Sequence, residues 1–526
     1  MAWGVLEDYK MGTVPGTTLL SKKGDLSGDV ATDASVKKAG NIVLIPQPSD
    51  SVNDPLNWSN TNKNVIIWLL AFASGMTVAL GPMVTPGFGQ VIEQYKVSLD
   101  QVSTYLVGLL VLSTGSGTFF TSAAAIVWGK RPVFVISLTV LLITCVWGFY
   151  TTSFVSLAVM RGLQGVAAAP IETLVTSTVS DLFFVHQRGQ KLAIWGSSIL
   201  VGVMLGQIIS GAVIQHFGFN ATFGITALIY VALLPAVYFF VPETAYQRRS
   251  LPKTWISEKE EAIEIELKDI ENTQKKSFAD SLSIFNGRVS DASFWKTAIK
   301  PVPLCTYPAV IFSTLVYGTF QTWLITISLL SVNIFAAPPY NLTPSQIGLT
   351  NLPQLLIGFL ATGLAGFFAD WIVGYMSRRN KGIYEPEFRL TLMIPATILS
   401  TIAFFGFGIS AGQGAPVAWP VLFMTVNAVA VPFATSASFT YVIDCHPQDA
   451  NQAFVTINFL KAIFVFVASL FVNGWLSKVG PQMVFSTIAG LNLVTCTFTI
   501  PIYVFGKKFR SMVSRSLHWF AGIRMY

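Results

Sequence analysis

The chain has 526 residues, of which 52% are hydrophobic and only 11% are charged, and its mean hydropathy is positive. Soluble globular proteins carry about 25% charged residues, so this composition excludes a soluble protein and indicates an integral membrane protein. The formal charge of +7 is typical of basic loops beside a membrane and does not predict a nucleic-acid partner.

The N-terminal segment, 1–63, is polar and rich in Gly, Ser, Thr, Asp and Lys. It has no apolar stretch of the kind found in a cleaved signal peptide. We therefore expect a disordered cytoplasmic tail, with the first apolar run acting as the insertion signal.

Apolar runs of about 20 residues, the length that crosses a bilayer core of about 30 Å, then follow one another along the chain. They predict an all-α integral membrane protein with twelve transmembrane helices. The spans are expected at 64–86, 101–122, 133–151, 153–180, 191–214, 222–242, 302–330, 345–372, 388–410, 416–443, 451–476 and 481–505.

A polar segment divides these spans into an N-terminal six-helix bundle (64–242) and a C-terminal six-helix bundle (301–505). Within the cytoplasmic linker, 243–300, Ser257 and Glu260 form a capping-box pattern ahead of apolar residues at helical spacing. This pattern predicts either a short amphipathic helix or a solvated charged linker. A basic C-terminal tail, 506–526, ends the chain.

The distribution of basic residues predicts the orientation. Of the 33 Lys and Arg residues, 29 fall in the two tails and in the loops after even-numbered spans, two in the opposite loops and two within spans. This asymmetry places both termini in the cytoplasm. The glycosylation sequons at Asn220 and Asn341 then fall in outer loops, as candidate N-glycosylation sites.

The four cysteines, Cys145, Cys305, Cys445 and Cys496, lie in or beside apolar runs and are expected to pack as small apolar residues. Their spacing fits neither a disulfide framework nor a metal site, and no cofactor motif is present. The absence of a nucleotide-binding loop argues against an ATP-driven pump. The absence of a catalytic constellation argues against an enzyme.

Two loops echo each other in the two halves. "WGKRPVF" (128–134) follows the second span, "GFFADWIVGYMSRRNKG" (366–382) closes the eighth span, and each contains a basic cluster. An internal repeat of this kind predicts two pseudo-symmetric bundles that rock around a central site. We expect a cytoplasmic gate at Gly129, Lys130, Arg131, Asp370, Arg378 and Arg379. The last three are expected to build it from ion pairs, and the alternative is that their charges only set the orientation in the membrane.

Buried charges indicate where the central site lies. Of the 26 acidic residues, only Glu172 falls well inside a span, and Arg161 precedes it in the same span. Eleven helical steps separate the two by about 16 Å but by only about 20° around the axis, so both should face one polar cavity. A charge in mid-membrane is costly and is usually functional.

Glu172 is therefore predicted to bind a proton, to balance a cationic substrate, or to do both in alternation. The alternative is a permanent brace in which Glu172 pairs with Lys461. Arg161 is expected to be a fixed positive element that tunes a nearby acid and helps gate the cavity. Further polar residues at helical spacing could recognise a substrate or could bond between helices: Gln164, Tyr317, Gln321, Trp323, Asn427, Asn458 and Lys461.

Five short motifs follow one another along the chain: "DPLNWS" (54–59), "GKRP" (129–132), "RGLQG" (161–165), "VPETAY" (241–246) and "RRNKGIYEPEFRL" (378–390). In this order they resemble the Major Facilitator Superfamily, and within it the fungal twelve-span drug:proton antiporter-like branch. The last motif resembles a subgroup with polyamine- and cation-handling members. The packing-glycine spacing of the branch is kept at Gly202, Gly206 and Gly211. Two positions depart from the family pattern: Ile126 replaces an acid and Gln207 replaces a proline.

The resemblance implies a secondary transporter of the major facilitator fold. It implies proton-coupled export of a drug, toxin or secondary metabolite by alternating access, with uptake of organic cations such as polyamines as the alternative. A non-transporting receptor is disfavoured, because only about twenty residues follow the last span. The expected partners are the lipid bilayer, a small organic substrate and protons, for a monomer in the plasma membrane rather than the vacuole.

Overall fold

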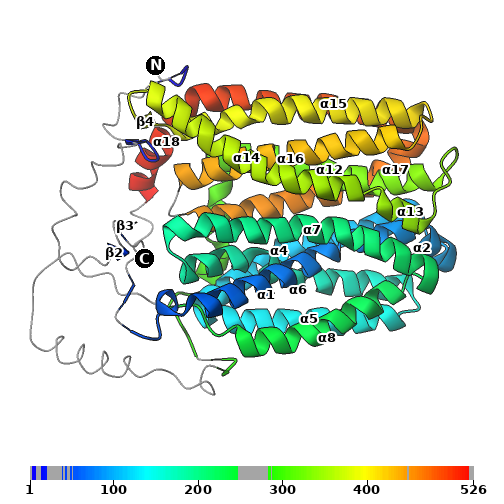
Figure 1. Ribbon diagram of the computed structural model, residues 1–526, viewed down its shortest axis with the longest axis horizontal. Helices are drawn as coiled ribbons and strands as arrows, with labels where there is room; N and C mark the ends of the chain where they lie inside the picture. The colour runs from blue at the N-terminus through cyan, green and yellow to red at the C-terminus, as the bar shows by residue number, and fades with distance from the viewer. Residues whose placement is uncertain are drawn as a thin grey trace, which may run out of the picture.

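The computed structural model describes residues 3–6, 14–19, 38–39, 42–43, 48–49, 51–246, 282–285, 287–446 and 449–520. Within these ranges long helices lie side by side and form almost the whole molecule (Figure 1). The described strands are two short antiparallel pairs, β1 (Thr18–Leu19) with β4 (Ile383–Tyr384) and β2 (Lys38–Ala39) with β3 (Ile42–Val43). The all-α fold is therefore confirmed.

The N-terminal half, residues 54–246, contains the short helix η2 (Pro55–Asn57) and the helices of the first six spans. These are α1 (Asn60–Ala79), η3 (Pro82–Gly87), α2 (Phe88–Tyr95), α3 (Leu99–Ser103), the π-helical turn η4 (Thr104–Gly108), α4 (Leu109–Trp128), α5 (Lys130–Tyr150), α6 (Phe154–Leu182), α7 (Val185–Phe217) and α8 (Ala221–Phe240).

The C-terminal half begins with the last helix of the linker, α11 (Phe294–Ile299), and ends with α18. Its elements are η5 (Val302–Thr306), α12 (Pro308–Ala336), α13 (Pro344–Leu349), α14 (Leu352–Arg379), η6 (Pro386–Leu392), α15 (Met393–Gly412), α16 (Ala418–Cys445), α17 (Ala450–Thr497) and α18 (Thr499–Phe520).

Eleven helical runs in the described part of the chain are long and apolar enough to cross a membrane. The last run, Ala450–Arg515, contains two crossings, because Gly480 breaks α17 with a left-handed backbone (φ 77°) and Pro481 follows it. This run thus covers the eleventh and twelfth predicted spans. Helices are the expected solution in lipid, where every backbone N–H and C=O must be satisfied within its own segment.

The two halves repeat a local signal at the start of their second spans. Ser98 and Gln101 form a capping box at α3, and Thr343 and Gln346 form the equivalent box at α13. We call the end of the molecule that carries α2, α3 and α13 the distal side, and the end that carries β4 and α18 the terminal side (Figure 1).

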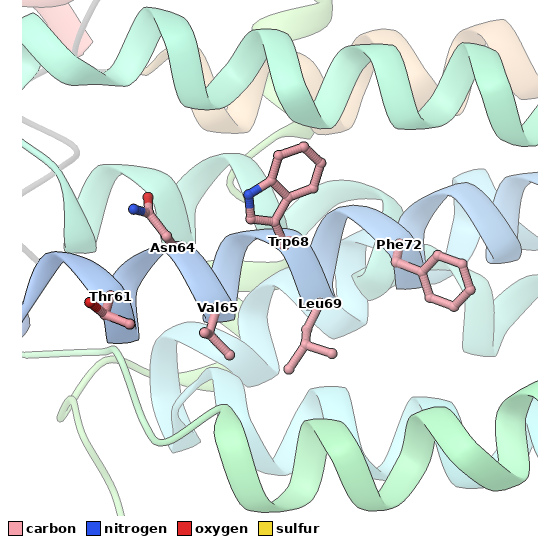
Figure 2. Close-up of a pocket in the computed structure, with 6 residues that line it drawn as sticks. All are labelled: Thr61, Asn64, Val65, Trp68, Leu69 and Phe72. Carbon is pink, nitrogen blue, oxygen red and sulfur yellow. The ribbon is translucent and has the colours of Figure 1, made fainter.

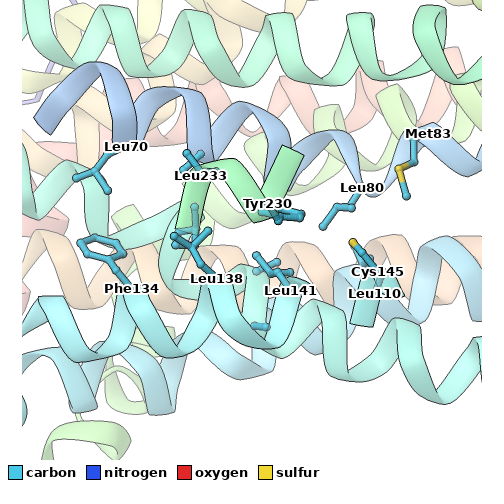
Figure 3. Packing of buried hydrophobic residues seen from close by; sticks show 14 of the residues in the cluster. Leu70, Leu80, Met83, Leu110, Phe134, Leu138, Leu141, Cys145, Tyr230 and Leu233 are labelled. Atoms are coloured by element: carbon cyan, nitrogen blue, oxygen red, sulfur yellow. The ribbon is translucent and has the colours of Figure 1, made fainter. Parts of the chain in front are cut away.

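Buried apolar side chains from α1, α5 and α8 pack together in the core of the N-terminal half (Figure 3). Leu70, Phe134, Leu138, Leu141 and Tyr230 are among them, and each is at most 1% exposed. The apolar side chains that remain exposed on these helices, such as Phe72, Ile143 and Leu228, face outward and suit contact with lipid.

Parts of the N-terminal tail pack against the C-terminal half, in contrast to the disordered tail that the composition predicts. Residues 18–19 pair as β1 with β4, and the N–H of Leu6 donates to the carbonyl of Val504 at 3.0 Å. Val5 is fully buried. The predicted amphipathic helix after Ser257 lies outside the described residues.

The spaced glycines of α7 lie where helices approach closely. A Cβ on Gly202 would lie 2.1 Å from the carbonyl oxygen of Gly75 on α1, and one on Gly206 would lie 2.9 Å from the Cβ of Ala79. A Cβ on Gly211 would lie 2.4 Å from the carbonyl oxygen of Pro344, in the opposite half. Small residues are what such backbone contacts between membrane helices require.

We expect Gly202→Ala to lower the free energy of unfolding by about 1–3 kcal/mol, because α1 and α7 must move apart to admit the methyl group. Thermal unfolding of the purified protein would measure the loss. Gly196→Ala on the same helix is the matched control, because a Cβ there meets nothing within 4 Å. A control that loses as much stability as Gly202→Ala would contradict the packing argument.

His446 follows α16 and lies against the ring of Tyr307, with ring centroids 4.9 Å apart. Burial lowers the pKa of His446 from 6.5 to about 4, with the charges of Asp449 and Arg510 acting in opposite directions. The folded protein therefore binds this proton less readily than the unfolded chain does.

Because the unfolded chain binds the His446 proton more readily, protonation favours unfolding as the pH falls from 6.5 towards 4. The folded state should therefore keep its full stability above pH 6.5 and lose part of it progressively over this range. We expect His446→Gln to flatten the dependence of the melting temperature on pH between those values. An identical pH profile in the parent and in the variant would contradict the assignment.

Candidate functional site

An ion pair joins the two halves in the middle of the membrane-spanning region. The Oε1 atom of Glu172 on α6 lies 3.9 Å from the Nζ atom of Lys461 on α17, and their side chains are 27% and 14% exposed. At this distance the two charges attract each other without a direct hydrogen bond. The pair therefore connects the halves by electrostatic attraction alone.

Aromatic rings stand beside this pair. The Nζ atom of Lys461 lies 5.6 Å from the ring centroid of Tyr317 on α12, a cation–π arrangement. The Tyr317 ring in turn contacts that of Phe439 on α16, with centroids 4.5 Å apart. The site therefore has a carboxylate, an ammonium group and aromatic faces from four helices of both halves.

Close backbone contact brings α4 and α17 together beside the pair. A Cβ on Gly115 would lie 2.5 Å from the Cβ of Ala462 and 3.3 Å from the carbonyl oxygen of Asn458. The predicted residues Asn458 and Gln321 are both partly exposed, on α17 and α12 respectively. Both lie one helical turn from a member of the aromatic and charged cluster.

Arg161 and Gln164 do not share the cavity of Glu172, contrary to the expectation from helical geometry. Both are 0% exposed inside the N-terminal half. Arg161 donates to the carbonyl oxygens of Leu106 at 2.7 Å and Leu80 at 2.8 Å, and to the Oε1 atom of Gln164 at 2.6 Å. At the level of Arg161 other helices cover the face of α6 that is open at Glu172.

Asn427 and Trp323 contain buried polar atoms that lack a hydrogen-bond partner among the described residues. Asn427 on α16 is 1% exposed, and neither its Oδ1 nor its Nδ2 is bonded. The Nε1 atom of Trp323 on α12 is likewise unbonded. Leaving such groups unpaired costs about 1–3 kcal/mol each, so these two side chains are suited to bond a ligand or water.

On the terminal side, the predicted residues 129–131 belong to a polar network. The Nζ atom of Lys130 lies 2.5 Å from Asp181, and Glu243 accepts hydrogen bonds from the backbone N–H groups of Lys130 and Arg131, both at 3.0 Å. Gly129 has a φ of 95°, and a Cβ there would lie 2.3 Å from Glu243.

The other half of the predicted gate is not formed as expected. Asp370, Arg378 and Arg379 are exposed, and none makes an ion pair with another described residue. Arg389 pairs with Asp444 instead, at 2.5 Å. Arg378 and Arg379 stand in the last turn of α14, where the guanidinium of Arg379 lies 4.8 Å from the ring centroid of Tyr375.

The C-terminal network extends into the tail helix. Glu385 accepts hydrogen bonds from Lys507 at 2.7 Å, Arg510 at 2.9 Å and Thr17 at 2.7 Å. Glu387 accepts two from Arg510, at 3.0 and 2.8 Å. The bonds to Glu385 lower its pKa despite the opposing effect of burial, which alone would raise it. The basic tail thus supplies partners for two carboxylates of the preceding loop.

The network residues stand in motifs that the sequence already displays. Glu243 lies in "VPETAY", and Glu385, Glu387 and Arg389 lie in "IYEPEFRL". The pair Lys130–Asp181 in one half corresponds to Arg389–Asp444 in the other, since each links the second loop of a half to the end of its fourth span. The motifs located these residues, but nothing in the sequence showed the pairing.

Polar contacts also close the distal side between the halves. The Nδ2 atom of Asn473 donates to Ser103 at 2.9 Å, and the N–H of Gly474 donates to Asp100 at 3.1 Å. Gln207, in place of the proline of the family pattern, donates to Ser328 of the opposite half at 2.7 Å.

The two sequons differ in their surroundings. The side-chain amide of Asn220 donates to the backbone carbonyls of Phe149 and Thr151, so its nitrogen is engaged within the fold. Asn341 is exposed in the loop between α12 and α13.

A pocket lies on the outer face of α1 (Figure 2). Thr61, Asn64, Val65, Trp68, Leu69 and Phe72 line it. Ser74 of the same helix bonds to the carbonyl of Ile171 on its opposite face, so the pocket does not belong to the central site. In the described part of the chain, no three His, Cys, Asp or Glu side chains gather as metal ligands would.

Comparisons with known proteins agree with this architecture. An uncharacterized MFS-type transporter of Schizosaccharomyces pombe is 25% identical, over 97% of this chain and 95% of its own. Protein HOL1 of Saccharomyces cerevisiae is 23% identical, over 95% of this chain and 96% of its own. A probable drug/proton antiporter of the same yeast, YHK8, is 21% identical over 83% of this chain and 82% of its own.

Among solved structures, a D-xylose-proton symporter shares the fold with a TM-score of 0.60 and 12% identity, over 85% of this chain and 99% of its own. The sequence pattern of the Major Facilitator Superfamily matches residues 67–469, which is more than half of the chain. The chain is therefore a multi-pass membrane protein and not an enzyme, and it belongs to the Major Facilitator Superfamily of transporters.

Proposed function

We propose that the protein exports a small organic compound in exchange for protons, with Glu172 as the proton-binding group. The observation that carries this proposal is the ion pair of Glu172 with Lys461, because it crosses from one half to the other. A carboxylate whose cation sits on the opposite half can couple its own protonation to the position of the two halves.

The coupling follows from electrostatics. Ionised Glu172 attracts Lys461 and favours the approach of α6 and α17. Protonation removes that attraction, and so the halves can separate around the site. The spacing of 3.9 Å suits a contact that breaks in each cycle better than a permanent brace, which would need direct hydrogen bonds to offset the desolvation of both charges.

The substrate site would lie beside this pair. Tyr317 and Phe439 offer aromatic faces beside the pair. Asn427 lies about 18 Å from Phe439 along α16 and Trp323 about 9 Å from Tyr317 along α12, and both contain polar atoms that lack a partner among the described residues. Apolar walls with a few placed polar groups are typical of sites for small organic molecules. Several relatives bear export names, among them the efflux pump radE of Floropilus chiversii and the MFS antiporter QDR3 of Candida albicans.

Uptake of an organic cation is the second candidate. Gln207 favours it, because this residue replaces the proline associated with antiporters and bonds across the two halves to Ser328. In that case Glu172 would balance the charge of the substrate and protons would move inward with it. In both cases we place both termini in the cytoplasm, and a monomer in the plasma membrane.

Proton coupling can be tested in vesicles that enclose a pH-sensitive dye, with polyamines and aromatic xenobiotics as the added compounds. We expect substrate-dependent proton flux in the parent and its loss in Glu172→Gln, because an amide cannot bind the proton. The matched control is Glu93→Gln, since Glu93 is exposed on α2 far from the pair. The sign of the flux separates export from uptake.

If Glu172→Gln kept the full proton flux and had a lower melting temperature, the proposal would be overturned. Glu172 would then only stabilise the packing of the two halves. The active compounds in the panel would identify the substrate class. Loss of flux in Glu93→Gln as well would show that the assay reports folding rather than coupling.

Asn341 should carry an N-linked glycan when the protein is made in a eukaryotic host, because it is exposed in a loop on the distal side. A glycosidase-sensitive mass shift is expected to vanish in Asn341→Gln and to remain in Asn220→Gln, since the amide of Asn220 is engaged by two carbonyls. A glycan on Asn220 alone would contradict this difference, and a glycan on neither would withdraw support for the orientation.

A further inference from the structure

The second span begins with an irregular turn. Thr104–Gly108 is π-helical, and the N–H of Leu109 donates to the carbonyl of Thr104, five residues back. Such a turn holds one residue more than a regular α-helical turn, and it occurs frequently at functional sites. We refer to residues 104–108 as the π turn.

The π turn is a point of contact between the halves on the distal side. The hydroxyls of Ser103 and Thr104 both donate to the carbonyl of Ser469 on α17, at 3.1 and 2.9 Å. Neighbouring residues of a regular α-helix point about 100° apart, so the two would not ordinarily reach one acceptor. A Cβ on Gly108 would lie 2.1 Å from the Oγ atom of Ser469, so α17 fits only against glycine.

We define the distal gate as Asp100, Ser103, Thr104 and Gly108 facing Ser469, Asn473 and Gly474. Its bonds join hydroxyl, amide and backbone groups, together with the carboxylate of Asp100, which accepts from the N–H of Gly474. No ion pair joins these residues within the described chain. Contacts of this kind can form and break without a large change in solvation.

Arg161 on α6 binds the π turn through hydrogen bonds within the N-terminal half. Its Nε atom donates to the carbonyl of Leu106, within the turn, while its NH2 atom donates to the carbonyl of Leu80 at the end of α1. Its NH1 atom binds Gln164 on its own helix. Arg161 is completely buried and has no acidic partner among the described residues, so its charge is satisfied mainly by these oxygens.

We propose that Arg161 is a positioning residue for the distal gate: it fixes the π turn so that Ser103 and Thr104 meet Ser469 and close the distal side. The planar guanidinium suits this task, because it presents donors in several directions from one rigid group. The proposal assumes alternating access, as the proposed function does, but it requires neither proton coupling nor a particular substrate.

This role differs from a direct action on Glu172. The two side chains lie eleven residues apart on α6, about 16 Å along the helix axis, and Arg161 is enclosed by α1, α6 and the π turn. A change at Arg161 should therefore alter the distal gate before it alters the central ion pair.

Spin labels on Lys96→Cys and Lys478→Cys would test the proposal. Both positions are exposed on the distal side, Lys96 between α2 and α3 and Lys478 on α17. The labels are attached to the full chain in lipid nanodiscs, with Cys305, the partly exposed one of the four cysteines, replaced by serine. Pulsed electron spin resonance then measures the distance between the labels.

We expect one short-distance population in the parent and a second, longer population in Arg161→Lys. Lysine keeps the charge, but its three donors share one nitrogen, whereas arginine reaches Leu106, Gln164 and Leu80 from three separate atoms. Gly108→Ala should also yield the longer population, because its methyl group cannot coexist with Ser469. A distance distribution in Arg161→Lys that matches the parent would overturn the proposal.

Arg510→Lys is the matched control, since Arg510 is a buried arginine on the terminal side that is 3% exposed. It should lower the melting temperature and leave the distance unchanged. If Arg510→Lys produced the longer distance population to the same extent, the effect of Arg161→Lys would reflect general destabilisation, and the proposal would be overturned.

If Arg161→Lys does not fold, Gln164→Leu removes one of the acceptors that orient the guanidinium and should give the longer population in smaller proportion. No change in Gln164→Leu would then count against the role of Arg161. The distances are measured without substrate or a proton gradient, so a failure of proton coupling at Glu172 would leave this test unaffected.

Discussion

The absence of water from the bilayer core is the constraint on which the rest of this structure depends. Each buried charge must find its partners within the protein, because an unpaired charge there costs several kcal/mol. Arg161 meets this constraint with the backbone oxygens of Leu80, at the end of α1, and Leu106, in the π turn, and Glu172 meets it with Lys461 of the opposite half. The hydrogen bonds of Arg161 lie within one bundle, whereas the Glu172–Lys461 pair depends on the position of one bundle relative to the other.

The same constraint orders the two ends of the molecule. On the terminal side, where solvent is close, carboxylates and cations form dense networks within each half, such as Lys130–Asp181 and Arg389–Asp444. On the distal side, the halves meet through hydroxyls, amides and glycines, such as Ser103, Asn473 and Gly108. The strong interactions therefore stabilise each bundle, and the weaker ones join the bundles, as a rocking mechanism requires.

Much of the fold could be predicted, because span length and apolar content are properties of consecutive residues. The twelve spans and the equivalence of the two halves followed from these properties. The site was predicted less completely. Helical geometry placed Arg161 and Glu172 on one side of α6, but it could not show that α1 and the π turn cover that side at Arg161 and that α17 approaches it at Glu172.

The predicted cytoplasmic gate likewise shows that the sequence did not reveal which residues pair. Basic residues at 378, 379 and 381 marked the loop, but the ion pair formed at Arg389 instead, since η6 brings that residue to Asp444 at the end of α16. The π turn left no signal in the composition of 104–108, because one extra residue in a helical turn barely alters a hydropathy pattern.

The sequence by itself determined the class of the protein, the number of its spans and the short set of ionisable residues that the membrane encloses. Each of these depends on local composition summed along the chain. The tertiary structure alone decided which charge meets which partner and which helix each packing glycine meets. Those pairings depend on distances between residues up to hundreds of positions apart, such as Glu172 and Lys461, and only the packing of helices sets such distances.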